Sequence, residues 1–372
     1  MKKFKRLALI LMAASMLLAM LAACGGSSQI DYDNLKIVIV TSGSSVDDGS
    51  FNQNNYEGIT DFIGANPGAT VVPVTSPSIE TSKVDVEAVV ADYDVIVVPG
   101  YQFGSVSAVA IENPDKYFIL VDEYPVAIDG MDEFDNIHAM KFKEQESGFF
   151  AGIAAAMETK TGKVAFIGGQ AFPPVVNYHF GFNAGVLWAN NNLGTDAQII
   201  ELAGRAGEDV LGTNVGGNYT QSFGDQAVGK EIGDALINEG VDILFIAAGA
   251  SGLGAFTSAM EKDIKVIGCD VDQFNYGVYA NGNVVLTSVL KNMRINVTRQ
   301  LTEIKNQTFK GGNYTLGADT DSTGFVSAEG RHQLSADTLA AMNDAYAKIK
   351  SGEIQPPGNF FEGNLGFSGI LG

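Results

Sequence analysis

An aromatic ring and an amide stand side by side where the first helix of this chain is expected to begin, at Phe51 and Asn52. They follow a buried strand at residues 37–40 and a loop rich in Ser, Gly and Asp. In parallel α/β sheets, ligands bind at the carboxyl ends of the strands, where a helix N-terminus also offers free backbone N–H groups. A large apolar ring directly after a polar loop either tucks into the core or holds a ligand.

Carboxylates end two further expected strands, Asp122 after residues 117–121 and Asp270 after residues 265–269. An ionised carboxylate accepts hydrogen bonds and could hold a ligand that carries hydroxyl groups. The alternative is that each carboxylate caps the following helix or loop, a common role of Asp. A third acid, Asp48, lies in the loop before Phe51. It is the one most strongly expected to have a purely structural role, because the pair Asp48-Gly49 favours a turn.

Length and charge narrow the class of protein. A chain of 372 residues exceeds the usual size of one hydrophobic core, so two lobes are expected. Acidic residues outnumber basic ones by 43 to 23, a net charge of −20. Such a surface repels phosphate backbones and excludes nucleic acid as a partner.

The N-terminus has the pattern of a targeting segment. A basic stretch (residues 1–6) precedes an apolar stretch (residues 7–20) that is too short to span a bilayer comfortably. Leu21-Ala22-Ala23-Cys24 then resembles a bacterial lipobox, in which Cys24 is lipid-modified and becomes the first mature residue. We therefore expect a signal peptide at 1–23, a lipidated tether at 24–34 and a cell-membrane location on the extracytoplasmic face. The alternative is an ordinary secretory signal with an incidental cysteine.

Strands alternate with helices along the rest of the chain, the pattern of parallel α/β sheets. The first series of strands is expected at 37–40, 70–74, 94–99, 117–122 and 137–142, and the second at 163–169, 198–202, 211–215, 241–249 and 265–270. Two such arrays joined by crossing segments predict a hinged, two-lobed binding protein with a cleft at the carboxyl ends of both sheets. Residues 284–305 are interpreted as a strand and a helix that return to the first lobe. The expected lobes are 35–140 with 271–308, and 141–270 with 309–372.

Six segments in order resemble the BMP (basic membrane protein) family of substrate-binding lipoproteins of ABC importers. The opening segment is VTSGSSVDDGSFNQ at 40–53, and the others are 144–169, SFGD at 222–225, AAGASG at 247–252, IGCDVDQ at 267–273 and TSVLK at 287–291. The resemblance implies a class I periplasmic-binding-protein fold, with two Rossmann-like lobes, a hinge and a central ligand cleft. The family includes the purine nucleoside receptor, so the implied ligand is a nucleoside, in the first instance a purine one.

The resemblance also implies a ligand site made by both lobes. Phe51 and Phe223 would sandwich the base. The first-lobe wall would carry Asp48, Asn52 and Asp122, and the ribose end would be held by Gly249, Asp270 and Lys291. Phenylalanines after a turn are more often core residues, and Lys291 could be a solvated surface charge. A carboxylate such as Asp270 could accept both hydroxyls of a ribose diol, with Lys291 neutralising it.

Two positions depart from the family pattern. Ser42 stands where the family commonly has Asp, and Gly49 stands where it often has Lys. Because Ser42 carries no charge, the resemblance does not determine which base the site prefers.

Enzymatic motifs are missing from the sequence. Its three histidines (His138, His179 and His332) are widely spaced, and no HExxH, P-loop or GxSxG motif occurs. We therefore expect a monomeric receptor without catalysis, cofactor or metal that delivers its ligand to an ABC permease and ATPase. The alternatives are a sugar-binding or signalling lipoprotein that uses the same cleft, and a degenerate Rossmann-type enzyme.

Overall fold

A computed structural model describes residues 30–76 and 78–358, and those of them from Asp33 onward form one compact unit. The expected signal segment and Cys24 lie outside the described residues. Among those that are described, no helix combines the length and the apolar character needed to cross a membrane.

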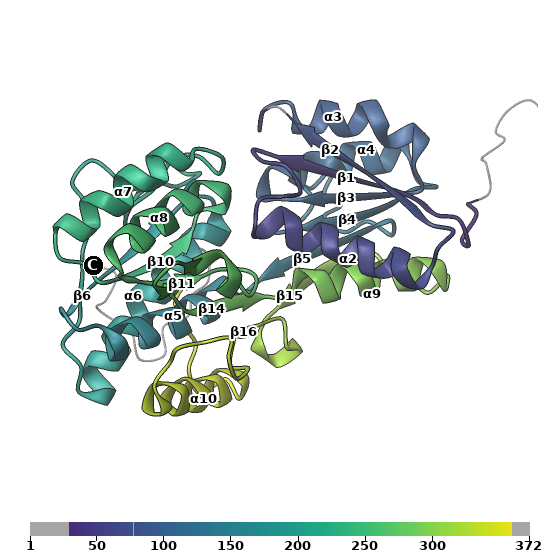
Figure 1. Ribbon diagram of the computed structural model, residues 1–372. Helices are drawn as coiled ribbons and strands as arrows, with labels where there is room; N and C mark the ends of the chain where they lie inside the picture. The colour runs from purple at the N-terminus through teal and green to yellow at the C-terminus, as the bar shows by residue number, and fades with distance from the viewer. Residues whose placement is uncertain (1–29, 77, 359–372) are drawn as a thin grey trace, which may run out of the picture. The chain divides into compact units, whose positions relative to one another are not determined.

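The first sheet is built from six parallel strands (Figure 1). In spatial order they are β2 (Thr70–Ser76), β1 (Lys36–Ser42), β3 (Val95–Pro99), β4 (Tyr117–Val121), β5 (Ile137–Phe142) and β15 (Gly312–Leu316). The order reverses between β1 and β3, which makes the carboxyl ends of these two strands the switch point where such sheets bind ligands.

The second sheet repeats this arrangement. Its strands in spatial order are β7 (Gln198–Ile199), β6 (Lys163–Gly168), β10 (Ile243–Ala247), β11 (Lys265–Gly268), β14 (Val285–Lys291) and β16 (Thr323–Phe325), of which only β16 is antiparallel to its neighbour. Two short hairpins lie outside the sheets: β8 (Gly207–Glu208) with β9 (Asn214–Gly216), and β12 (Val278–Tyr279) with β13 (Gly282–Asn283).

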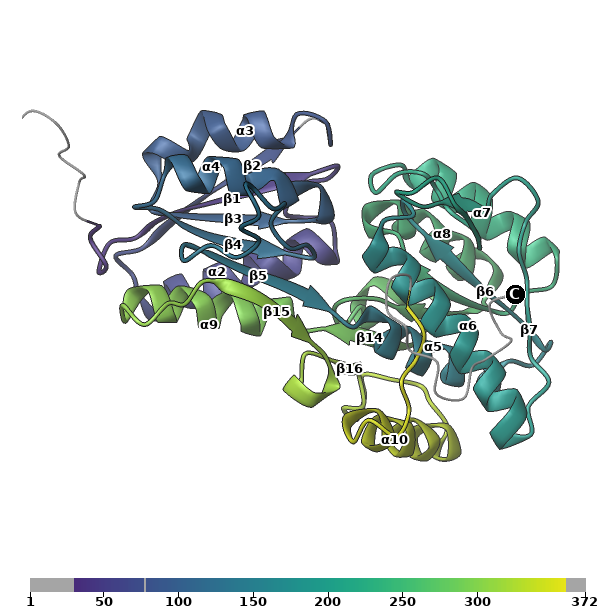
Figure 2. The same ribbon diagram turned by 180° about the vertical axis from the view of Figure 1, so that it is seen from behind.

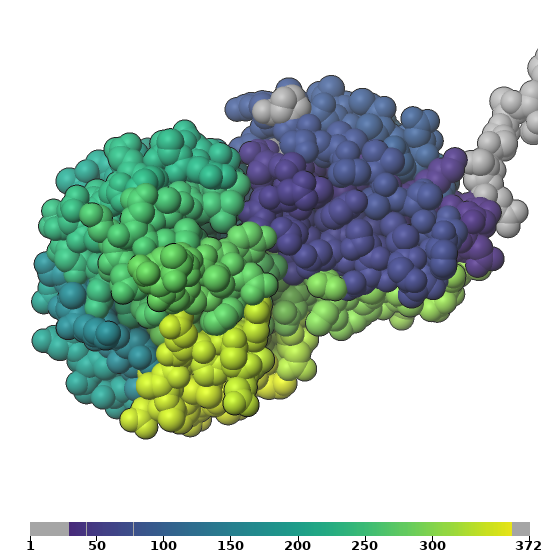
Figure 3. Space-filling view, viewed as in Figure 1, coloured from purple at the N-terminus to yellow at the C-terminus, as the bar shows by residue number. Residues whose placement is uncertain are grey.

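Helices cover both faces of each sheet (Figures 1 and 2). The first sheet lies between α3 (Ser82–Val89) with α4 (Val106–Glu112) and α2 (Phe51–Ala65) with α9 (Met293–Lys305). The second sheet carries α5 (Glu144–Glu158), α6 (Pro173–Leu193), α7 (Gln226–Asn238) and α8 (Gly249–Lys262). Helix α10 (Ala336–Lys350) packs against α5 and forms the yellow surface in Figure 3.

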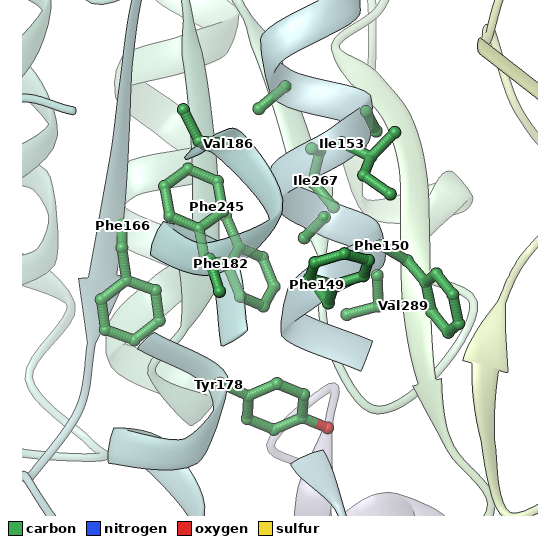
Figure 4. Close-up of a cluster of buried hydrophobic side chains, with 14 of the residues drawn as sticks. Phe149, Phe150, Ile153, Phe166, Tyr178, Phe182, Val186, Phe245, Ile267 and Val289 are labelled. Atoms are coloured by element: carbon green, nitrogen blue, oxygen red, sulfur yellow. The ribbon is translucent and has the colours of Figure 1, made fainter. Parts of the chain in front are cut away.

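Strand β6 shows why the buried strands are continuous apolar runs in the sequence. Val164 and Phe166 belong to the cluster of buried side chains on the α5 and α6 face, whereas Ala165 and Ile167 belong to the cluster under α7 and α8. Successive side chains of a strand point to opposite faces, so a sheet covered on both faces needs apolar residues at every position. Figure 4 shows the first of these clusters, with Tyr178 at its edge.

Four glycines set the spacing of α5 and α6. A Cβ on Gly148 or Gly152 would lie 2.3 or 2.2 Å from a backbone oxygen of α6, and one on Gly181 or Gly185 would lie 2.2 Å from a backbone oxygen of α5. No larger residue fits at this separation, so the glycines permit the two helix backbones to touch. The close packing brings the first residue of α5, Glu144, beside the first turns of α6.

The chain crosses between the sheets three times, and two crossings differ from the predicted lobe boundaries. The first follows β5, as expected near residue 140. The second lies between β14 and α9 rather than after residue 270, because β14 pairs with β11 and completes the second sheet. The third lies between β15 and β16 rather than at residue 308, since β15 pairs with β5. The apolar pattern of a strand does not specify its pairing partner, and for this reason the sequence placed β14 in the wrong lobe. β15 is a half-exposed edge strand that the sequence analysis did not identify, and it was assigned to the wrong lobe together with the residues around it.

Candidate ligand-binding site

One pocket lies at the carboxyl ends of both sheets, the place where ligands bind in sheets of this kind. All eight residues that the sequence proposed for the site line it: Asp48, Phe51, Asn52, Asp122, Phe223, Gly249, Asp270 and Lys291. The structure thus brings together residues from six separate segments of the chain. Whether they bind a ligand stays a prediction.

Asp48 and Asn52 shape the loop before α2. The carboxylate of Asp48 accepts the backbone N–H groups of Ser50, Asn52 and Gln53 at 2.9–3.1 Å. These are N–H groups that a helix start leaves without a helical partner, so Asp48 caps α2. The side-chain amide of Asn52 donates to the carbonyl and the hydroxyl of Ser44. The structural interpretation of Asp48 therefore holds, and most of its accepting capacity is already used.

The two phenylalanines are half-buried and line the pocket, and Phe223 also packs against the buried cluster on the α5 and α6 face. Phe223 lies over Gly169, where an added Cβ would come within 2.3 Å of the ring. The ring of Phe172 lies 5.9 Å from that of Phe223 and 5.5 Å from that of Tyr101. These three rings form a continuous aromatic wall that starts in the second lobe and ends in the first.

Asp270 is held from both lobes. Ser50 of the first lobe donates its hydroxyl to Oδ2 at 2.7 Å, and Tyr178 of the second lobe donates to Oδ1 at 2.9 Å. Each carboxylate oxygen has a further lone pair, so two ligand hydroxyls could still be accepted. Burial, and then the neighbouring carboxylate of Asp270, raise the pKa of Tyr178 well above its ordinary value, so the hydroxyl stays a donor.

Lys291 is fully buried and not the solvated charge that the sequence left open. Its ammonium group lies 2.5 and 2.6 Å from the two carboxylate oxygens of Asp122 and 3.0 Å from Oε1 of Glu144. The same group lies 5.0 Å from the ring centroid of Phe51, a cation–π distance. The expected direct pairing with Asp270 is replaced by pairing with Asp122 and Glu144.

These buried charged groups shift one another's pKa values. Burial raises the pKa of Asp122 to about 7, with Lys291 opposing the shift and Glu144 and Asp270 adding to it. Burial lowers the pKa of Lys291, but Asp122, Glu144 and Asp270 outweigh burial, so its pKa lies above the ordinary value. The ammonium group therefore stays charged. Asp122 and Glu144 both pair with it, and Asp270 adds negative charge at longer range.

Contacts between the lobes surround the pocket. Besides the bond from Ser50 to Asp270, the amide of Gln273 donates to the carbonyl of Gly49 at 2.9 Å, and Tyr276 donates to Gln53 at 3.2 Å. The loop before α2 therefore touches the segment after β11, as expected of a closed cleft.

Several pocket or network residues were missed by the sequence analysis: Tyr101, Gln102, Glu144, Phe172 and Tyr178. Glu144 had a signal, since it opens the second of the family segments. Tyr178 reads as a core residue on an apolar helix, and nothing in its spacing marks a hydroxyl that reaches Asp270. Among the described residues, no group of three or more His, Cys, Asp or Glu side chains could hold a metal ion.

Two solved structures share this two-lobed fold. An ABC transporter system solute-binding protein from Aeropyrum pernix has a TM-score of 0.73 at 22% identity and covers 88% of this chain and 94% of that one. Another from Conexibacter woesei has a TM-score of 0.63 at 21% identity, over 88% and 100%. The fold is that of the two-lobed solute-binding proteins.

Sequence comparison shows the family. The model of the Bmp family, described as ABC transporter substrate-binding protein PnrA-like, matches residues 35–202 and 213–359, and the chain belongs to this family. The CD4+ T-cell-stimulating antigen of Listeria monocytogenes is 32% identical over 93% of this chain and 97% of its own. The ABC transporter nucleoside-binding protein BmpA of Lactococcus lactis is 30% identical over 79% and 83%. The chain is thus an ABC transporter substrate-binding protein.

Proposed function

We propose that this protein captures a purine nucleoside in the pocket between its lobes and delivers it to an ABC permease without chemical change. The observation that carries the proposal is the meeting of half-buried aromatic rings and carboxylates in one pocket. The name of the Lactococcus relative, a nucleoside-binding protein, supports it.

The aromatic side of the pocket suits a flat base. Phe51 and Phe223 come from different lobes, and no direct contact joins their rings within the described part of the chain. A base that stacks on such rings gains about 0.5–1.5 kcal/mol per aromatic pair beyond the burial of area. A base between the lobes would also favour closure, because each ring belongs to one lobe.

The polar side of the pocket suits a ribose. Asp270 and Asp122 offer accepting oxygens to neighbouring hydroxyl groups, and hydrogen bonds to a charged group contribute about 1.5–3 kcal/mol each. Gly249, the first residue of α8, also lines the pocket. At this N-terminus of the helix, backbone N–H groups lack helical partners. Excess negative charge around Lys291 opposes a ligand with a phosphate.

Capture would proceed by hinge closure. The ligand shifts the equilibrium between open and closed forms by as much as it prefers the closed one. Lys291 and Glu144 lie at the second and first crossings between the sheets, so the charges at the site also lie at the hinge. A lipid on Cys24 would hold the receptor at the extracytoplasmic face of the membrane, beside its permease.

Isothermal titration calorimetry with the mature protein tests the proposal. We expect adenosine, inosine or guanosine to bind, their 5′-phosphates to bind at least 100-fold more weakly, and free ribose not to bind. A free sugar that binds while every nucleoside fails would favour the sugar-binding alternative. Mass spectrometry of the ligand that co-purifies would identify the nucleoside, and an unchanged ligand after incubation would exclude turnover.

A further inference from the structure

Most polar side-chain atoms around the pocket are already paired within the protein. Asp48 and the amide hydrogens of Asn52 are used inside the loop before α2, Asp122 pairs with Lys291, and Asp270 accepts two hydroxyl groups. A base that stacks between the lobes must satisfy its own donors and acceptors with the groups that remain.

Gln102 supplies such a group. It lines the pocket from the turn after β3, it is half-buried, and across residues 30–76 and 78–358 its side-chain amide has no hydrogen-bond partner. The hydroxyl of Tyr101 and Oδ1 of Asn52 also lack a partner in this part of the chain. Of the three, only the amide of Gln102 carries both a donor and an acceptor on one rigid plane.

The position of the amide is set by a glycine. Nε2 and Oε1 of Gln102 lie 2.5 and 2.6 Å from the point that a Cβ of Gly100 would occupy. Gly100 itself lines the pocket and has a φ of 132°, a conformation that favours glycine. The side chain of Gln102 is therefore folded back over the pocket wall.

The aromatic wall leads to the turn that carries this amide. It runs from Phe223 through Phe172 to Tyr101, the residue next to Gln102. A base that stacks on Phe223 is thereby directed with one edge toward the turn that carries Gln102.

We propose that Gln102 reads the hydrogen-bonding edge of the base and lets the pocket accept both amino- and oxo-purine nucleosides. This inference rests on the proposed function. Glutamine pairs through two hydrogen bonds with the neighbouring donor and acceptor of adenine. Rotated by half a turn about its last bond, the same amide matches the N1–H and O6 of hypoxanthine or guanine. A carboxylate at this place would only accept, which suits the two adjacent donors of guanine, N1–H and N2–H, and not adenine.

The test compares adenosine and guanosine by calorimetry at pH 8, where a glutamate is ionised, on four proteins. These are the native protein, Gln102→Glu, Gln102→Leu, and Gln198→Glu as a control with the same charge change on the exposed edge strand β7. The native protein should bind both nucleosides within about tenfold of each other. Gln102→Glu should move the affinity ratio at least tenfold toward guanosine, Gln102→Leu should weaken both about tenfold, and Gln198→Glu should change neither.

Three outcomes decide the matter, with a melting curve on each variant to confirm folding. A shifted ratio in Gln102→Glu alone supports the assignment. Native binding with an unchanged ratio in Gln102→Glu overturns it and leaves the proposed function standing. Failure of the native protein to bind any nucleoside overturns the proposed function and this inference together.

Discussion

Asp122 and Asp270 stand at equivalent places in the two sheets. Asp122 follows β4 and Asp270 follows β11, each the fourth strand in the spatial order of its sheet. Both residues have a left-handed backbone, with φ of 75° and 67°, which costs a residue with a Cβ about 1–2 kcal/mol. The strained turn aims each carboxylate at the pocket from the opposite lobe, so the site has an internal symmetry that no single segment reveals.

The first prediction separates ribose contacts from base contacts. We expect Asp270→Ala to weaken binding of a ribonucleoside by on the order of 3–5 kcal/mol, because two charge-assisted bonds are lost. Phe51→Leu should cost about 1–2 kcal/mol, because mainly stacking is lost. A 2′,3′-dideoxynucleoside should be nearly indifferent to Asp270→Ala and stay sensitive to Phe51→Leu. Calorimetry with both ligands at one salt concentration measures this.

Stability provides the control for that comparison. Asp270→Ala leaves the buried hydroxyl of Tyr178 without its acceptor, at a cost of about 1–3 kcal/mol in the free energy of unfolding. Adding Tyr178→Phe should recover much of this loss without restoring ribose binding. Equal losses for the two ligands on Asp270→Ala would mean that Asp270 shapes the lobe contact and that Asp122 holds the sugar.

The second prediction concerns pH. The pKa of Asp122 is raised from 3.8 to about 7, so between these values the folded protein holds a proton that the unfolded chain releases. The stability that this proton contributes is fully present below about pH 4 and is lost as the pH rises through 7. Asp122→Asn should therefore lose less stability between pH 4 and 8 than the native protein. Urea unfolding across this range measures the difference.

The exposed Asp196 provides the matched control, since Asp196→Asn removes a carboxylate outside the pocket. Its stability curve should run parallel to that of the native protein. If the curve of Asp122→Asn also ran parallel, the carboxylate would not bind the proton, and the excess charge around Lys291 would be carried in another way.

The third prediction tests the seat of the base-stacking ring. Gly169→Ala would place a Cβ within 2.3 Å of Phe223 and must move this ring. We expect nucleoside affinity to fall at least tenfold. Gly64→Ala is the control: it lies in α2 with nothing within 4 Å of the new Cβ, so binding should not change, and the gain in helix propensity of about 1 kcal/mol should raise stability. Native affinity in Gly169→Ala would exclude Phe223 from the base site.

The fourth prediction concerns the anchor. Cys24→Ala should release the mature domain into the aqueous phase of a detergent partition while its melting temperature stays unchanged, because β1 begins only at Lys36. A bacterial lipoprotein cysteine carries several acyl chains, enough for stable anchoring where one chain is marginal. If the variant remained in the detergent phase, the lipobox interpretation would be wrong.

Much of the architecture could be read from local patterns. Apolar runs of four to six residues between helical segments indicated the central parallel strands of both sheets, since strands covered on both faces carry an apolar residue at every position. The family segments added the eight pocket residues by resemblance. Those patterns did not specify pairing: β14 was placed in the wrong lobe, because a buried strand looks the same beside any partner. β15 was not identified, because it is a half-exposed edge strand without an apolar run.

The amino-acid sequence by itself determined the two α/β arrays, the acidic surface and the residue types that gather at the strand ends. Only the tertiary structure decided which charges meet. Lys291 was expected to face Asp270, yet it lies against Asp122 and Glu144, and Asp270 takes Ser50 and Tyr178 instead. Hydrogen bonds and ion pairs act over about 3 Å, whereas these partners are separated by tens to hundreds of residues in the chain, so the packed sheets alone bring them within reach.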